Sequence, residues 1–214
     1  MTKRRPRFTA KSADKHTLYQ LSVQEPEADI QFINRVYQRA YGKKPLKLRE
    51  DFCGSALFST EWVRSDKQRS AVGLDLEKDV LKWAVQNNIN TLSEEQQKRI
   101  KLHCKDVTAG HTGSHHAIVA FNFSYCVFKQ RRDLLRYFKR IKQDLATDGI
   151  FFMDMHGGVE TFIELEESQR KGGFTYVWDQ MPYDAINGHA IRHIHFRFPD
   201  GTEIKKAFTY DWRL

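Results

Sequence analysis

Residues 48–81 constrain the fold more than any other part of the chain. They contain a short strand pattern, a turn of small residues at 53–56, a helical pattern, a second strand and then Asp75. This order is typical of a parallel α/β sheet, because a parallel pair of strands needs a crossover connection, usually a helix. It also places a helix N-terminus and a carboxylate at one edge of the sheet, where ligands bind in open α/β folds.

The rest of the chain continues the alternation of strands and helices. The spacing of apolar residues predicts helices in residues 16–24, 27–41, 57–63, 78–86, 94–99 and 132–145. Strands are predicted in residues 45–52, 70–76, 100–104, 115–123 and 149–155. Three later strand patterns occupy residues 174–181, 189–198 and 203–212, the last two joined by a turn at 199–201. We therefore expect a doubly wound, Rossmann-like, mostly parallel sheet with helices on both faces, plus a C-terminal antiparallel β element.

The length of 214 residues suits one domain with a sizeable core. We expect a disordered basic tail in residues 1–15, a core in 16–173, and antiparallel cover or terminal strands of the same domain in 174–214. The formal net charge is +8, concentrated in the tail and in residues 129–142. Such charge suits contact with nucleic acid. We favour a solvated helix face and a free tail as the explanation, since no aromatic interleaving or RNA-binding motif accompanies the charge.

The composition indicates the cellular compartment of the protein. No apolar run approaches the ~18 residues of a membrane span, and no apolar segment follows the basic N-terminus as in a secretory signal. The cysteines number three and have no CxxC spacing. A cytoplasmic protein without a disulfide framework is expected.

Three features suggest a site for a nucleoside-containing ligand. Small side chains around Gly54 let a ligand approach the backbone at the start of a helix. Asp75, at the end of the second strand, can accept hydrogen bonds from both ribose hydroxyls. Asp106, at the end of the third strand, can reach an adenine amine.

These segments resemble the motifs of class I S-adenosylmethionine-dependent methyltransferases. EDFCGSA resembles the first motif, GLDLE the second and KDV the third, while AFNFSYCVF stands where the fourth lies. The resemblance covers residues 17–173. It is nearest to a bacterial group with the segments REDFCG, NFSYCVF and FTYDWRL.

The resemblance implies S-adenosylmethionine as cofactor, S-adenosylhomocysteine as product, and a set of binding residues. The implied cofactor contacts are Tyr19 in a covering lid segment, Glu50 or Asp51, Cys53, Gly54, Ser55, Ala56, Asp75, Leu76, Asp106, Val107, Asn122 and Phe123. Tyr125 and His156 are candidates for substrate contact. No catalytic base is identified, and no metal site is expected, although His193 and His195 share a strand face.

The first motif departs from the family pattern. Positions 52 and 56, which are glycines in the usual ExGxGxG, are Phe52 and Ala56 here, so only Gly54 is kept. The motif acid aligns with Glu50, but Asp51 is adjacent, and the sequence leaves open which carboxylate serves. Neighbouring residues of a strand point to opposite faces, so the two do not form an acid/base pair.

The substrate class stays open at this stage. A small-molecule methyl acceptor is favoured, because NFSY differs from the Asn/Asp-Pro-Pro-Tyr signature of many base-amine methylators. The alternatives are an RNA methyltransferase and a non-catalytic nucleic-acid-binding module. A nicotinamide-dependent oxidoreductase is disfavoured, since residues 52–57 read FCGSAL where GxGxxG is needed.

The late strands allow two arrangements. The family's sheet normally finishes with a helix and two more strands, whereas this sequence stops at Leu214, so we expect a shortened form whose central sheet is incomplete and has an exposed edge. Alternatively, the late hairpin supplies those final strands. An incomplete sheet would favour pairing with a second chain, which makes a dimer one of the expected states.

Overall fold

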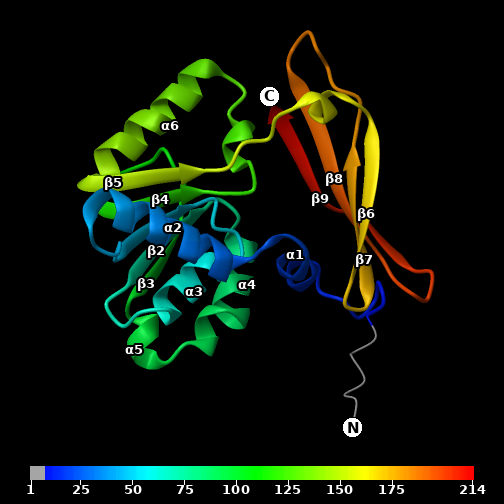
Figure 1. Ribbon diagram of the computed structural model, residues 1–214. Coiled ribbons are helices and arrows are strands. Elements are labelled where there is room, and N and C mark those ends of the chain that lie inside the picture. The colour runs from blue at the N-terminus through cyan, green and yellow to red at the C-terminus, as the bar shows by residue number, and fades with distance from the viewer. Residues whose placement is uncertain (1–7) are drawn as a thin grey trace. The chain divides into compact units, whose positions relative to one another are not determined.

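The computed structural model describes residues 8–214 and divides the chain into two compact units. Residues 25–125 and 130–155 form what we call the parallel unit, and residues up to 24, 126–129 and 156–214 form the antiparallel unit. Figure 1 labels the α-helices and most of the strands of the two units. Among residues 8–214, no helix combines the length and the apolar character needed to cross a membrane.

The parallel unit alternates strands and helices as predicted. Its elements are α2 (Pro26–Tyr41), β1 (Lys47–Asp51), α3 (Leu57–Arg64), β2 (Ser70–Asp75), α4 (Lys78–Asn87), η1 (Ile89–Thr91), α5 (Glu94–Gln97), β3 (Ile100–Cys104), β4 (His115–Ala120), α6 (Arg131–Asp144) and β5 (Leu145–Met153), with η2 (Ser124–Val127) at its boundary. The strands are all parallel, in the order β3-β2-β1-β4-β5. The strand order reverses between β1 and β4, and ligands bind at such a switch point in open sheets.

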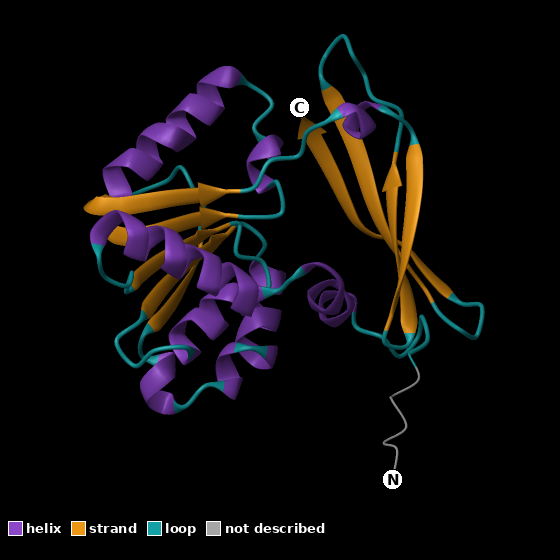
Figure 2. Cartoon of the chain, in the orientation of Figure 1, coloured by secondary structure: helices purple, strands orange, loops and turns teal. Residues whose placement is uncertain are grey.

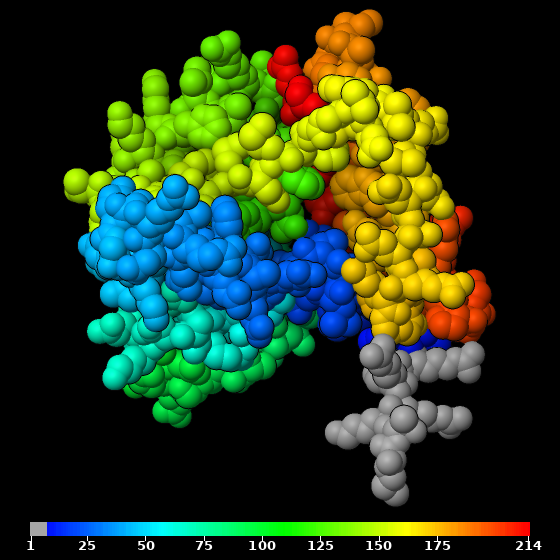
Figure 3. Space-filling model, in the orientation of Figure 1, coloured from blue at the N-terminus to red at the C-terminus, as the bar shows by residue number. Residues whose placement is uncertain are grey.

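Helices cover both faces of this sheet (Figures 1 and 2). Glu50 of β1 bonds to Ser59 of α3, whereas the next residue, Asp51, bonds to Tyr137 of α6. Because successive strand residues point to opposite faces, α3 and α6 lie on opposite sides of the sheet. Residues of α2 and α3 share one apolar core with the strands, and α2 covers much of the near face of this unit in Figure 3.

Local sequence explains where α2 begins and ends. Pro26 occupies its first turn, where a missing N–H costs nothing. Gly42 follows the helix with a φ of 68°, a left-handed conformation that glycine adopts without strain. Between them, Ile30, Ile33 and Tyr37 form the buried stripe that holds the helix against the sheet.

The antiparallel unit consists of α1 (Lys15–Val23), η3 (Val159–Phe162) and a four-stranded sheet. The strands are β6 (Leu165–Lys171), β7 (Phe174–Gln180), β8 (His189–Arg197) and β9 (Glu203–Arg213), in sequential order. Leu18 of α1 packs against Ile194 and Phe196, which alternate along β8 with His193 and His195. The alternation predicted for this strand is confirmed.

The late strands do not extend the parallel sheet. They form their own sheet, and among residues 8–214 no strand adjoins β5 on the side away from β4. Among the described residues the parallel sheet therefore ends at β5, and the alternative, in which the late hairpin completes that sheet, is wrong.

Several boundaries differ from the sequence prediction. β4 ends at Ala120 rather than 123, because Asn122 and Phe123 have left-handed backbones that cannot continue a strand. β6 was not predicted, because LEESQRK is too polar to read as a strand, yet it pairs along its whole length with β7. β5 begins at Leu145 rather than 149, because a register shift opposite β4 includes residues 145–149 in the strand. The basic residues 1–7 lie outside the described residues, whereas 8–14, expected to be disordered, include a turn in which Ala10 N donates to Thr202 Oγ1 at 3.0 Å.

Candidate functional site

The turn after β1 has an unusual backbone that leaves room for a ligand. Phe52, Gly54 and Ala56 have φ angles of 57°, 50° and 52°, all in the left-handed region. Only glycine enters this region without a steric cost, so neighbouring contacts hold the other two residues there. Among residues 8–214, a Cβ added at Gly54 would meet nothing nearer than the Phe52 carbonyl oxygen, 4.0 Å away. The space beside Gly54 is therefore open.

The other residues of the turn support it from inside the protein. Cys53 and Ala56 are buried and pack with Leu81 and Ala84 of α4. The carbonyl oxygen of Ser55, also buried, accepts a hydrogen bond from the Asn88 amide at 2.7 Å. Cys53, Ser55 and Ala56 are buried as whole residues, backbone included, so the cofactor contacts expected of them stay predictions.

Asp75 joins the second strand to this turn. Its Oδ2 accepts a hydrogen bond from Gly54 N at 2.7 Å, and its Oδ1 accepts one from Glu77 N at 2.9 Å. Each carboxylate oxygen keeps a further lone pair for a hydroxyl donor. The next side chain, Leu76, is 64% exposed although it is apolar, so it offers a flat apolar surface beside the carboxylate.

Glu50 points toward the start of α3. Its Oε2 accepts hydrogen bonds from the backbone N and the Oγ of Ser59, at 2.9 Å and 2.5 Å. Complete burial raises the pKa of Glu50 to about 7, an effect that the hydrogen bonds from Ser59 oppose and the charges of Asp75 and Asp51 reinforce. Of the two candidate motif acids, Glu50 is the one that supports the helix following the turn.

Asp51 points to the opposite face and has another role. Its carboxylate binds Arg49 Nε at 2.7 Å and the Tyr137 hydroxyl at 2.8 Å, in the interior between β1 and α6. Burial raises the pKa of Asp51 to about 6, against the lowering effect of the Arg49 charge. The structure therefore separates the two neighbouring acids, as the strand alternation predicted, and places Asp51 in a structural ion pair.

Glu50→Gln is expected to remove a pH-dependent part of the stability. The pKa of Glu50 is raised in the folded protein from the ordinary 4.5 to about 7, so the folded state binds a proton that the unfolded chain releases. The stabilisation is fully present below a pH of about 4.5 and is lost as the pH rises through about 7, a change of ~3 kcal/mol. Urea unfolding across this interval measures it.

Glu77→Gln is the matched control for this experiment, because Glu77 is an exposed glutamate at the start of α4. Wild type and this control should lose stability in parallel as the pH rises, while the Glu50 variant keeps a flatter profile. Superimposable profiles for all three proteins would contradict the raised pKa of Glu50.

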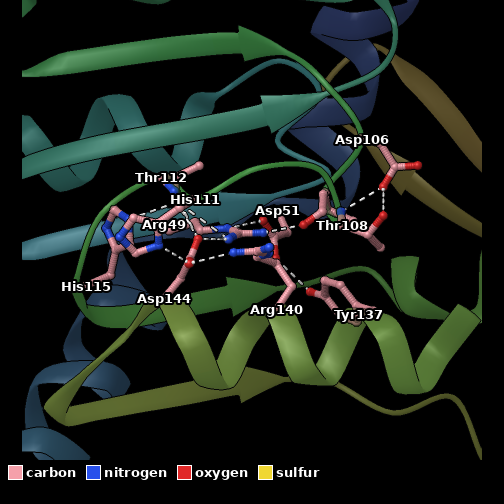
Figure 4. Close-up of polar contacts among 11 residues, drawn as sticks. Arg49, Asp51, Asp106, Thr108, His111, Thr112, His115, Tyr137, Arg140 and Asp144 are labelled. Carbon is pink, nitrogen blue, oxygen red and sulfur yellow. Dashed lines mark hydrogen bonds and ion pairs between the residues drawn. The ribbon is translucent and has the colours of Figure 1, made fainter.

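A buried ion-pair network lies on the Asp51 side of the sheet (Figure 4). Arg49 has a fully buried side chain, and its Nη1 binds Asp144 Oδ2 at 2.6 Å. Asp144, the last residue of α6, also accepts from Thr112 N at 3.1 Å and contacts His111 Nδ1 at 2.5 Å. Burial acts to raise the pKa of Asp144, but the hydrogen bonds from His111 and Thr112 lower it below its usual range. The network fixes the loop between β3 and β4 to β1 and α6.

The same network holds the segment that carries Asp106 and Val107. Arg49 Nη2 donates to the Val107 carbonyl oxygen at 2.6 Å. One oxygen of Asp106 accepts from both N and Oγ1 of Thr108, at 2.7 Å each, which is a local turn. Figure 4 shows the other oxygen of Asp106 directed away from this turn, where it can accept a further donor.

The end of β4 is a second strained turn. Asn122 and Phe123 are consecutive non-glycine residues with φ angles of 57° and 58°. Their backbone N–H groups donate to the two oxygens of Asp154, the residue after β5, at 2.7 Å and 2.9 Å. Strain of this kind is concentrated at functional sites. The predicted contacts at 122 and 123 thus belong to the same unit as Gly54, Asp75 and Asp106.

Two predicted residues belong to the other unit. Tyr19 lies on α1, with its ring 4.9 Å from that of Phe208. His156 lies with its ring 5.5 Å from Trp212, and burial lowers its pKa. Tyr125, by contrast, lies in η2 within the parallel unit. The lid role of Tyr19 and the substrate contact of His156 stay predictions.

Sequence reasoning missed Arg49, Asp144 and Asp154. Asp154 could have been identified from the sequence, because it is an acid at the end of an apolar strand. Asp75 was predicted from the same kind of position. Arg49 and Asp144 could not have been identified in this way. They are 95 residues apart in the chain, and a charged residue alternating along a strand normally indicates a solvated face.

Comparisons with known proteins identify the fold. A scan against protein-family models gives no match, and neither does a search of curated protein sequences. A search of solved structures finds a SAM-bound amino pentose methyltransferase of calicheamicin biosynthesis from Micromonospora echinaspora. It has a TM-score of 0.71 and 12% identity, covering 99% of this chain and 85% of that one.

Two further structures agree. A sugar N-methyltransferase from a Streptoalloteichus species has a TM-score of 0.67 and 14% identity, covering 100% of this chain and 82% of the other. A SAM-dependent methyltransferase from Clostridium acetobutylicum has a TM-score of 0.66 and 17% identity, covering 92% and 78%. At these identities the likeness is one of fold. The chain has the Rossmann-like fold of class I SAM-dependent methyltransferases, and the predicted fold class is confirmed.

Proposed function

We propose that this protein is a SAM-dependent methyltransferase that acts on a small molecule. The observation that carries the proposal is the 2.7 Å hydrogen bond from Gly54 N to Asp75, because it brings the turn after β1 and the acid after β2 to one point. That point lies at the carboxyl edge of a parallel sheet, beside the reversal of strand order between β1 and β4. Open sheets bind nucleoside cofactors at this place.

The residues present fit an adenosyl group with a methionine tail. Open space at Gly54 would receive the methionine moiety against the backbone at the start of α3. Asp75 would accept from the ribose hydroxyls, and Leu76, with its exposed side chain, would contact the adenine ring. The second oxygen of Asp106 would accept from the adenine amine. Asn122 has a half-buried amide without a side-chain hydrogen bond among the described residues, so it can bond to the cofactor near its sulfur.

The chemistry then requires little from the protein beyond alignment. When bound, the cofactor supplies an electrophilic methyl group on a positively charged sulfur. The protein's part is to hold donor and acceptor in line and to exclude water. Glu50 and Asp51 are unsuited to act as general bases, because both are buried and bonded within the protein. No residue of this chain is assigned as a base, and an acceptor that is unprotonated at the working pH needs none.

The small-molecule substrate is supported by the kinds of protein that share the fold. Two of the proteins compared above are an amino pentose methyltransferase and a sugar N-methyltransferase. Calorimetric titration with S-adenosylhomocysteine tests the cofactor, and a metabolite extract screened by mass spectrometry for SAM-dependent gain of one methyl group tests the acceptor. Absence of binding heat, together with salt-dependent RNA binding, would favour a nucleic-acid-binding module instead.

Asp75→Ala is expected to weaken S-adenosylhomocysteine binding by about 100-fold. The substitution removes two charge-assisted hydrogen bonds to the ribose, each contributing ~1.5 kcal/mol. Asp79→Ala is the matched control, since Asp79 is an exposed acid in the first turn of α4, four positions further along. Calorimetry should give an unchanged Kd for the control. An unchanged Kd for the Asp75 variant would remove the ribose contact from the proposal.

A further inference from the structure

The turn at the end of β4 needs an explanation that the proposed cofactor contacts do not supply. Asn122 and Phe123 both have left-handed backbones, with φ angles of 57° and 58°. Two consecutive non-glycine residues in this region cost free energy, most of all for the bulky Phe123. Such a conformation persists only where surrounding contacts over-determine it.

Asp154 supplies those contacts. β4 and β5 are neighbouring parallel strands, in register at Ala120 and Met153, so the residue after β5 lies beside the turn after β4. Oδ2 of Asp154 accepts from Asn122 N at 2.7 Å, and Oδ1 accepts from Phe123 N at 2.9 Å. A carboxylate is the acceptor suited to two adjacent N–H groups, because each of its oxygens takes one, and hydrogen bonds to a charged acceptor are the strong ones.

A carboxylate at this edge of the sheet also resembles a general base. Burial raises the pKa of Asp154, as it does for many catalytic acids. However, both oxygens already accept a backbone donor, and the turn loses its support if either leaves. The geometry therefore favours a fixed structural acceptor over a group that exchanges protons with a substrate.

We propose that Asp154 is a positioning residue, which holds Asn122 and Phe123 in the left-handed turn on which their contacts to the cofactor depend. The inference rests on the proposed function, because it concerns the fourth motif of the same site. It assigns Asp154 a role that acts through the backbone of Asn122 and Phe123.

Asp154→Asn tests the proposal with S-adenosylhomocysteine as the probe. The amide keeps one acceptor but presents an NH₂ group to the second N–H, so the turn loses one of its two supports. We expect the Kd measured by calorimetry to rise about 10-fold, which corresponds to ~1.4 kcal/mol. Asp148→Asn is the matched control, since Asp148 lies toward the amino end of β5, away from the turn after β4, and pairs with Lys43. Its Kd should equal that of wild type.

Phe123→Gly supplies a rescue that a merely structural role would not show. Glycine adopts the left-handed conformation without strain, so the turn needs less support from Asp154 in this background. The Asn substitution at 154 should then raise the Kd by only about 3-fold, measured from the Phe123→Gly protein. Equal losses in the two backgrounds would overturn the proposal, as would an unchanged Kd for Asp154→Asn alone.

Amide hydrogen exchange gives a readout that does not depend on the cofactor. The N–H groups of Asn122 and Phe123 should exchange at least about 10-fold faster in Asp154→Asn, while that of Ala120 in β4 keeps its protection. If Asp154→Asn does not fold, Asp154→Glu keeps the charge but displaces the carboxylate, and the same selective loss is expected. Uniformly faster exchange along β4, or none at 122 and 123, would refute the positioning role. Failure of wild type to bind S-adenosylhomocysteine would instead refute the proposed function. The hydrogen-exchange result would then still test whether Asp154 supports the turn.

Discussion

Arg49→Met is expected to destabilise the protein by about 3–5 kcal/mol, the loss seen when one partner of a buried ion pair is removed. The guanidinium is fully buried and binds two fully buried carboxylates, those of Asp51 and Asp144. Methionine fills similar space but, within residues 8–214, leaves Asp51 without a cation and Asp144 with only Arg140, at 3.5 Å, and His111. Burying an unpaired charge is the costliest change in a core. Since a domain is stable by only about 5–15 kcal/mol, urea unfolding should show a large fall in the midpoint.

Arg69→Met is the matched control for this loss. Arg69 is also buried, but it lies 3.9 Å above the Trp62 ring and bonds to Ser65 and Asn34, with no buried carboxylate as a partner. Arg69→Met should lower the free energy of unfolding by clearly less than Arg49→Met does. Equal losses in the two variants would mean that packing, and not the paired charges, determines the stability at Arg49.

A triple variant separates charge from shape. In Arg49→Met combined with Asp51→Asn and Asp144→Asn, the two fully buried carboxylates are neutralised together with their cation, so much of the lost stability should return. The Val107 carbonyl oxygen would still lack its donor, so the loop that carries Asp106 should stay less protected from hydrogen exchange than in wild type. A triple variant as unstable as Arg49→Met alone would contradict the ionic explanation.

The fold could be predicted from the sequence because its strands and helices have strong local signals. The alternating segment at 189–198, the helical stripe of α2 and the small-residue turn at 53–56 each indicate one structure by themselves. β6 could not be predicted in this way. Its residues are polar on both faces, and it is a strand only because β7 presents a row of backbone partners beside it.

The candidate site was predicted in part for a similar reason. Gly54 follows one predicted strand, and Asp75 lies at the end of the next. Their meeting at the carboxyl edge of the sheet follows from the order of strands and helices. The separation of Glu50 from Asp51 followed from strand alternation. The support of the site did not, because Arg49 with Asp144, and Asp154 with residues 122–123, are pairs between distant segments that only the folded sheet brings together.

Gly54→Leu is expected to abolish detectable S-adenosylhomocysteine binding, a loss of at least about 100-fold or ~2.7 kcal/mol. The glycine has a φ of 50° and nothing beside its Cβ position except the Phe52 carbonyl oxygen at 4.0 Å. A leucine side chain would therefore occupy the open space in which the methionine moiety is proposed to lie. The backbone N–H that donates to Asp75 is retained, so the change acts through volume.

Gly42→Leu separates this effect from backbone strain. Gly42 has a φ of 68°, ends α2, and has nothing within 4 Å of its Cβ position, so its substitution carries a similar left-handed cost of ~1–2 kcal/mol. Both variants should lose about 2–8 °C in Tm, measured by thermal unfolding. Only the Gly54 variant should lose affinity, as measured by calorimetry on folded protein. If both variants bind like wild type, the ligand does not lie beside Gly54. If both variants lose affinity equally, general destabilisation rather than the volume of the side chain explains the loss. The turn after β1 would then no longer be supported as part of the cofactor site.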